Sequence, residues 1–237
     1  MIRIGFAVML AYIAAVSPAR AQHSTLSERL DKENDWLINR WRGQIAQDLK
    51  RKQIVRSADD PIVPTLETVF EGMKPLLPAG KLFMYAPKSG AAGSHIELHV
   101  QTTLEETEKT RFVRLLEVTA EKWPNAPTVQ DRLAEHLRTP AVYEAGPVQG
   151  NEPGDLCYHL NSMFGASEIY IRNNVIVALH CRGPVADRKA ARGSKVRVEE
   201  LARERGEHTN ENAQCPSTVE SLGLQIDQLI RGALKHP

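Results

Sequence analysis

Two histidines and a glutamate alternate with apolar residues in the segment His95-Ile96-Glu97-Leu98-His99. Residues two apart on a β-strand share a face, so His95, Glu97 and His99 are predicted to project from the same side. Two imidazoles and a carboxylate are good ligands for zinc or a similar ion. Residues four apart lie about 13 Å apart along a strand, so a metal would need either a bulge or a ligand from elsewhere. The alternative is the solvent-facing side of an amphipathic strand.

The first 21 residues are predicted to be a secretory signal. Arg3 precedes an apolar run over residues 4–16, and Ala19-Arg20-Ala21 has the small residues of a cleavage site. The apolar run, about 13 residues, is too short to cross a hydrocarbon core of ~30 Å. We therefore expect cleavage between Ala21 and Gln22, export to the periplasm or secretion, and no stable membrane span after cleavage.

The cysteines and two neighbouring histidines form a second candidate set. Cys157-Tyr158-His159 and His180-Cys181 together offer two sulfur and two nitrogen atoms, which are zinc ligands. Adjacent strand residues face opposite sides, however, so His180 and Cys181 cannot both point at one ion. The oxidising environment of an exported protein also favours a disulfide over thiolate–metal bonding.

One disulfide with one thiol left over is therefore expected. If the strands predicted within residues 155–181 form a meander, Cys157 and Cys181 lie two strands apart, about 9.6 Å, beyond the ~7 Å limit for a disulfide. Cys215 directly precedes a predicted helix that must pack on the sheet. The favoured pair is Cys181–Cys215, and the other pairings stay open.

Composition and charge exclude several classes of function. Removing Arg3 and Arg20 from 30 Lys+Arg leaves 28, against 29 Asp+Glu, so the mature net charge is about −1. Nothing in that balance attracts nucleic acid. The chain contains no phosphate-loop motif, no G-x-S-x-G and no H-E-x-x-H, and no cofactor is expected.

Hydrophobic periodicity predicts alternating helices and strands. One segment is ambiguous: Thr103-Leu104-Glu105-Glu106 resembles a capping box, which favours a helix over 104–122, but a strand over 111–118 could instead form a hairpin with 94–101. We prefer the helix because its Glu, Lys and Leu content agrees with the cap. The other helices are expected at 26–49, 65–74, 129–137, 198–205 and 217–234, and the strands at 81–86, 94–101, 141–145, 155–160, 169–172 and 175–181.

These elements indicate an α+β fold, with a mainly antiparallel sheet and helices packed on it. Residues 22–237 are expected to form a single domain with an N-terminal helical segment over 22–58. Asn173-Asn174 suits the two-residue turn of a hairpin, because Asn tolerates positive φ. Both faces of that hairpin are apolar, which predicts a central position covered by helices.

Residues 94–182 carry a family resemblance. Gly154-Asp155 opens a strand, and Arg172-Asn173-Asn174-Val175 forms the following hairpin. This order resembles exported bacterial α+β domains and lipoproteins that have a Gly-Asp strand followed by an Arg-Asn-Asn-Val type of hairpin. Most members lack an assigned activity, so no catalytic residue is carried over. The chain lacks the lipidated cysteine of the lipoprotein members.

The sequence therefore predicts an exported, non-enzymatic module that binds a small ligand or another envelope protein. A metal-dependent hydrolase that uses His95, Glu97 or His99 is the alternative. No nucleic-acid partner is expected.

Overall fold

The computed structural model of this protein describes residues 26–85, 94–106, 111–138, 143–146, 150–162, 165–186 and 214–235. Contacts divide the chain into two compact units, residues 1–36 and 37–237. Of the first unit the structure describes 26–36, which belong to helix α2 (Leu26–Arg51). The predicted signal segment, with its cleavage site at Ala21-Gln22, and the helix predicted over 198–205 lie outside the described residues.

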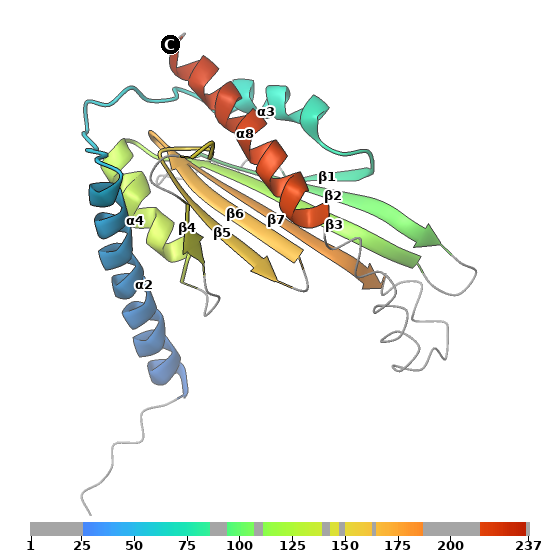
Figure 1. Cartoon of the computed structure of the whole chain (residues 1–237), viewed down its shortest axis with the longest axis horizontal. Helices are drawn as coiled ribbons and strands as arrows, with labels where there is room; N and C mark the ends of the chain where they lie inside the picture. Colours follow the sequence, from blue (N-terminus) through green and yellow to red (C-terminus); the bar gives the residue numbers. More distant parts are fainter. Residues whose placement is uncertain are drawn as a thin grey trace, which may run out of the picture. The chain divides into compact units, whose positions relative to one another are not determined.

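The second unit contains a seven-stranded antiparallel sheet in the order β1-β2-β3-β7-β6-β5-β4 (Figure 1). This arrangement, with helices packed on the sheet, confirms the predicted α+β class. The strands are β1 (Lys81–Tyr85), β2 (Ser94–Glu106), β3 (Arg111–Lys122), β4 (Glu144–Ala145), β5 (Leu156–Ser162), β6 (Gly165–Arg172) and β7 (Val175–Ala186).

One face of the sheet packs against helices α3 (Glu67–Met73) and α8 (Gln214–Lys235). A 3-10 turn, η1 (Lys74–Leu76), follows α3. In Figure 1 the long red helix α8 runs across this face. Every second residue of the central strands joins the resulting core, including Leu98 of β2, Val118 of β3 and Leu179 of β7, all fully buried or nearly so. Among the described residues, no helix combines the length and apolar character needed to cross a membrane.

The opposite face has a smaller apolar core. Helix α4 (Ala126–His136) and the part of α2 from Ile38 onward pack on β5, β6 and the first half of β7. Asn125 caps α4, because its side-chain oxygen accepts a hydrogen bond from the backbone N–H of Thr128. The strand residues in this core are Leu156, Tyr158, Ile169, Ile171, Ile176 and Ala178. No residue of β2 or β3 belongs to this core. The last residue of α4, His136, lies beside Glu121 of β3.

The β6–β7 turn is held by buried polar contacts. Asn173 adopts a φ of 48°, in the left-handed region. The two-residue turn predicted at Asn173-Asn174 requires a residue in this region. The fully buried side chain of Asn174 accepts from the N–H of Val63 at 2.8 Å and donates to the carbonyl of Trp123 at 2.9 Å. Arg172 pairs with Asp227 of α8 at 2.7 Å. The turn is therefore fixed to the loop that contains Val63, to Trp123 and to α8.

Cys181 and Cys215 form a disulfide, with their Cα atoms 5.4 Å apart, as predicted. Cys215 lies in the first turn of α8, because the helix begins at Gln214 and not at the capping sequence expected at Ser217. The hydroxyls of Ser217 and Thr218 instead donate to the carbonyl of Gln214. Cys157 is a free, fully buried thiol.

The helix predicted over 104–122 is wrong. Residues 94–106 and 111–122 form strands β2 and β3, which pair in antiparallel register from Ser94↔Lys122 to Glu106↔Arg111. The strand alternative is therefore the correct one. Tertiary packing outweighs helix propensity here, because Leu116, Val118 and Ala120 alternate with polar residues and can bury one side only as a strand.

The disulfide should contribute substantially to stability, because it closes a loop of 34 residues. Replacing both Cys181 and Cys215 with Ser should lower the free energy of unfolding by about 3 kcal/mol. Urea denaturation measures this difference. Wild-type protein in the presence of a reductant should match the double variant, and equal stability of the oxidised wild type and the double variant would contradict the expectation.

Candidate functional site

Alternating histidines and glutamates form a row on the face opposite α8, over β2 and β3 and outside the apolar core formed with α2 and α4. Glu97 Oε1 is 2.5 Å from Nε2 of His99, and Glu97 Oε2 is 3.5 Å from Nε2 of His95. His95 Nδ1 lies 3.4 Å from Glu121, whose other oxygen is 3.3 Å from Nε2 of His136. These five residues, called the histidine–glutamate row below, connect β2, β3 and α4.

Strand geometry positions the row. Ile96, Leu98 and Val100 of β2 point into the core under α8, so the residues between them must point to the opposite face. The register then sets His99 beside Glu117 of β3 and sets Glu117 beside His180 of β7. The polar side chains thus form a two-dimensional array across three adjacent strands.

Glu97 is held in its ionised form by its neighbours. Partial burial alone would raise the pKa of this carboxyl, but hydrogen bonds and charges from His99 and His95 outweigh it and lower the pKa below the ordinary 4.5. Glu97 is therefore a carboxylate at neutral pH, with one oxygen directed at each imidazole.

Glu121 and His180 are also perturbed. Burial acts to raise the pKa of Glu121, yet the hydrogen bond from His136 and the charges of His136 and His95 lower it below 4.5. Burial lowers the pKa of His180, which favours the neutral imidazole that binds metals. The Nδ1 atom of His180 lies 2.8 Å from the hydroxyl of Ser167 on β6, which fixes the orientation of the ring.

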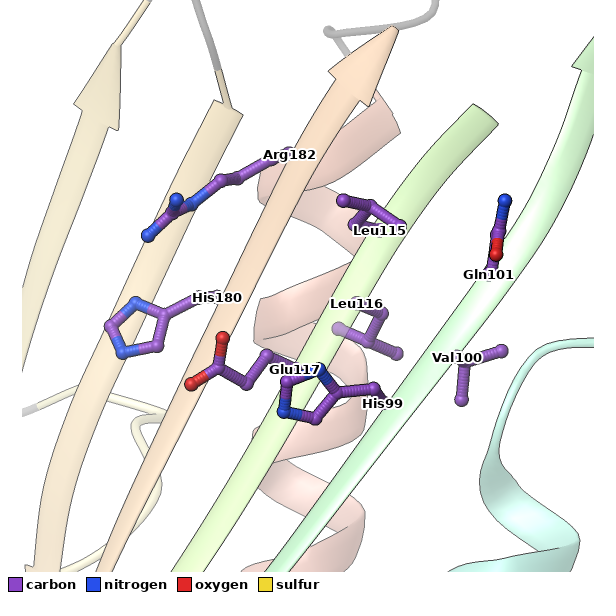
Figure 2. Close-up of a pocket in the computed structure, with 8 residues that line it drawn as sticks. All are labelled: His99, Val100, Gln101, Leu115, Leu116, Glu117, His180 and Arg182. Atoms are coloured by element: carbon purple, nitrogen blue, oxygen red, sulfur yellow. The ribbon is translucent and has the colours of Figure 1, made fainter. Parts of the chain in front are cut away.

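A shallow pocket of about 250 Å³ lies over this array. Figure 2 shows Glu117 between His99 and His180, with Arg182 and Leu115 further along their strands and α8 behind the sheet. Leu115 is 38% exposed, so the pocket has an apolar rim beside a polar floor. Gln101 adds an amide at the β2 side.

Three side chains in this pocket region can converge on one ion. A carboxylate oxygen of Glu97, a ring nitrogen of His99 and a carboxylate oxygen of Glu117 all lie within 4.8 Å of one another. Ligand atoms at about 2.0–2.2 Å from a zinc-like ion are at most about 4.3 Å apart, so small side-chain rotations would complete the site. Two oxygens and one nitrogen suit Mn²⁺, Fe²⁺ or Zn²⁺.

The predicted site residues are only partly brought together. Glu97 and His99 meet, and Glu117 lies close enough to both to supply the further ligand that a metal would need. His95 contacts the other oxygen of Glu97 and Glu121, so it lies one step along the row from the Glu97–His99–Glu117 group. His180 and Cys181 face opposite sides of β7, as predicted, with Cys181 under α8.

Sequence reasoning missed Glu117, Glu121 and His136. Glu117, Thr119 and Glu121 alternate with buried residues on β3, and this period-2 pattern was a usable signal. The expected helix over 104–122 hid it, because a helix would scatter the same side chains around its surface. The position of His136 beside Glu121 depends on how α4 packs, which no local pattern encodes.

Comparison with known protein families, with curated proteins and with solved structures finds no match to this chain.

Glu121 should make stability depend on pH. Its pKa is lower in the folded chain than the ordinary 4.5, so it stabilises the fold above pH 4.5, and this contribution is lost as the pH falls through the lowered value. Glu121→Gln should lower the free energy of unfolding by about 1 kcal/mol at pH 6. In strong acid the variant and the wild type should have the same free energy of unfolding.

Urea denaturation across this pH range measures the effect. Glu135→Gln is the matched control, because Glu135 forms an exposed pair with Arg132 and should change stability by less than about 0.5 kcal/mol. If the loss of unfolding free energy caused by Glu121→Gln stays constant down to the lowest pH, the role assigned to the carboxylate is contradicted.

Proposed function

We propose that this protein is an exported, non-enzymatic module that binds a divalent transition-metal ion through Glu97, His99 and Glu117. The observation that carries the proposal is the approach of these three ligand atoms to within 4.8 Å of one another, on side chains that are each partly exposed among the described residues. The ion is the small ligand of the binding module that the sequence predicts.

The rigidity of the ligands supports this function. Glu97 and His99 project from β2, and Glu117 projects from the paired position on β3. Both strands lie within the sheet, and the residues between the ligands are buried under α8. A site on paired strands is more nearly preorganised than one on loops, so little ordering is needed when the ion binds.

The charge of the pocket favours a cation. Glu117 and His99 line the pocket, and Glu97 lies beside them, with one oxygen within 4.8 Å of a ligand atom of each. The lowered pKa of Glu97 leaves it ionised at neutral pH. Arg182 is the one arginine or lysine among the described residues that line the pocket. An anionic ligand would face at least two carboxylates, which makes it a poor fit.

The export component rests on the N-terminal segment and on the disulfide. Disulfides such as Cys181–Cys215 persist in the oxidising compartments that exported proteins reach. Cleavage after Ala21 leaves every proposed ligand in the mature chain. N-terminal sequencing of the secreted or periplasmic protein tests this component, and Gln22 is the expected first residue.

Mn²⁺ binding tests the metal component. Protein stripped with a chelator is titrated with Mn²⁺, and free Mn²⁺ is followed by electron paramagnetic resonance. We expect one equivalent to bind. His99→Gln and Glu117→Gln should each weaken Mn²⁺ binding at least about tenfold. Even the loss of a residue that only hydrogen-bonds to a metal ligand typically lowers metal affinity 10–100-fold.

Glu71→Gln provides the matched control. It makes the same chemical change as Glu117→Gln, but Glu71 is an exposed residue of α3, 66% accessible and paired with Lys74. Its Mn²⁺ affinity should equal that of wild type. The proposed function would be refuted if the folded wild-type protein failed to bind Mn²⁺. It would also be refuted if His99→Gln, Glu117→Gln and Glu71→Gln all weakened Mn²⁺ binding equally.

A metal-dependent hydrolase is the second candidate, and the openness of the pocket favours it. Catalytic metal sites keep a coordination position free for water. Three protein ligands, two of which line the pocket, leave such a position. His180 and Arg182 could then contact a substrate. Metal-dependent hydrolysis of an activated ester that His99→Gln abolishes would favour the enzyme, whereas metal binding without turnover would favour the binding module.

A further inference from the structure

A second group of potential ligands lies on the opposite face of the sheet, under α8. Cys157 and His159 are two residues apart on β5, so they share a face. Glu168 is the residue directly opposite His159 on β6. The three side chains therefore start from neighbouring positions of one antiparallel pair, where cross-strand Cβ atoms are about 5 Å apart.

The distances show that the three side chains converge. Sγ of Cys157 is 3.5 Å from Nε2 of His159, and Nδ1 of His159 is 3.4 Å from Oε2 of Glu168. One sulfur, one nitrogen and one carboxylate oxygen lie within 4.8 Å of one another. Glu152 approaches the same imidazole, with its Oε1 3.5 Å from Nε2 of His159.

Glu168 has His159 as its neighbour but no hydrogen bond that explains its burial. Its side chain is 0% exposed, and neither carboxylate oxygen accepts a hydrogen bond from the described residues. Burying a carboxyl without hydrogen bonds is costly, so this buried carboxyl beside a thiol and an imidazole points to a role in binding a ligand.

Two glycines make room for the carboxylates of this group. A Cβ atom on Gly223 of α8 would lie 1.7 Å from Oε1 of Glu168. A Cβ atom on Gly146 would likewise lie 1.7 Å from Oε1 of Glu152. Any larger residue at either position would displace the carboxylate, so the backbone is shaped around both side chains.

We propose that Cys157, His159 and Glu168 bind a thiophilic divalent ion of the zinc class, with Glu152 as a fourth ligand. A thiolate with an imidazole and carboxylates is a donor set that zinc accepts in tetrahedral geometry. The sulfur distinguishes this site from the Glu97–His99–Glu117 site, which offers only nitrogen and oxygen and suits harder ions. The ion displaces the protons of the thiol and the carboxyl as it binds.

The disulfide leaves Cys157 available for this role. The chain has three cysteines, and Cys181 and Cys215 are bonded to each other. The expectation that oxidation would remove thiolate ligands therefore does not apply to Cys157. His159, whose side chain is 30% exposed, lies between the buried sulfur and the surface, and the other oxygen of Glu152 pairs with Lys52.

The same distances resemble a nucleophile–base–carboxylate triad, but burial argues against one. Cys157 is 0% exposed, so a substrate carbonyl cannot reach its sulfur. Burial, reinforced by the charges of Glu168 and Glu152, also raises the pKa of the thiol well above its ordinary value. An ion that enters beside His159 needs no such access, which is why the metal site is the better fit.

Cobalt substitution tests the proposal, because Co²⁺ replaces zinc and a thiolate–Co²⁺ bond gives a charge-transfer band in the near ultraviolet. Chelator-stripped wild-type protein titrated with Co²⁺ should develop this band, and added Zn²⁺ should abolish it. Cys157→Ser should lose the band entirely. His99→Gln should keep it unchanged, which separates this site from the proposed Mn²⁺ site.

Glu168→Gln and His159→Gln keep the test decisive if Cys157→Ser fails to fold. Circular dichroism checks the fold of each variant, and each should retain the band while weakening Co²⁺ binding at least about tenfold. Absence of a charge-transfer band in folded wild-type protein would overturn the proposal. A band that Glu168→Gln and His159→Gln leave at full affinity would also overturn it.

The two sites can fail separately. If His99→Gln weakens Mn²⁺ binding but wild-type protein gives no cobalt charge-transfer band, the proposed function stands and only this second site is refuted. Rapid labelling of Cys157 in folded, metal-free protein by an iodoacetamide reagent would favour the nucleophile and count against the buried metal ligand.

Discussion

The packing of α8 and α3 on one face of the sheet is the constraint on which the rest of the structure depends. It buries Ile96, Leu98 and Val100 of β2 together with Leu116, Val118 and Ala120 of β3. Because side chains alternate along a strand, this burial forces His95, Glu97, His99, Glu117 and Glu121 onto the other face. A shift of one residue in register would place the carboxylates in the apolar core, at a large cost in free energy. The disulfide at the first turn of α8 and the Arg172–Asp227 pair further along it hold the helix in place.

Both candidate sites exist because helices cover the sheet unevenly. On the face opposite α8, the described helices α2 and α4 pack over β5, β6 and the beginning of β7, where that face is apolar. Beyond Ala178 this face of β7 becomes polar, with His180 beside Glu117 of β3. Under α8, by contrast, Gly223 lets a carboxylate approach the helix backbone, so Glu168 sits beside Cys157 and His159 within an otherwise apolar layer. One site is open and rich in oxygen, whereas the other is buried and contains sulfur, so the two should prefer different ions.

Local patterns were sufficient for much of this fold. Alternation identified β2, and the Asn173-Asn174 turn identified the β6–β7 hairpin. Strand spacing argued against a Cys157–Cys181 bond and favoured Cys181–Cys215, the pair that forms. The prediction of a helix over 104–122 was wrong. It relied on a cap-like sequence and on helix-forming residues. The alternation of apolar and polar residues in the same segment stabilises a strand only when one side packs in a sheet. That error also concealed Glu117 and Glu121. The pairing of Glu168 with His159 depends on the β5–β6 register, and the position of His136 depends on how α4 docks, so neither contact could be read from residue spacing.

We propose that Glu97, His99 and Glu117 form a metal site on the face opposite α8. Anomalous diffraction from a crystal soaked in Mn²⁺ locates the ion independently of any assumption about its ligands. We expect a peak on the β2–β3 face between these three side chains, within about 2.0–2.3 Å of their ligand atoms. A map of the soaked crystal with no peak there, or with manganese bound only elsewhere on the chain, would contradict it.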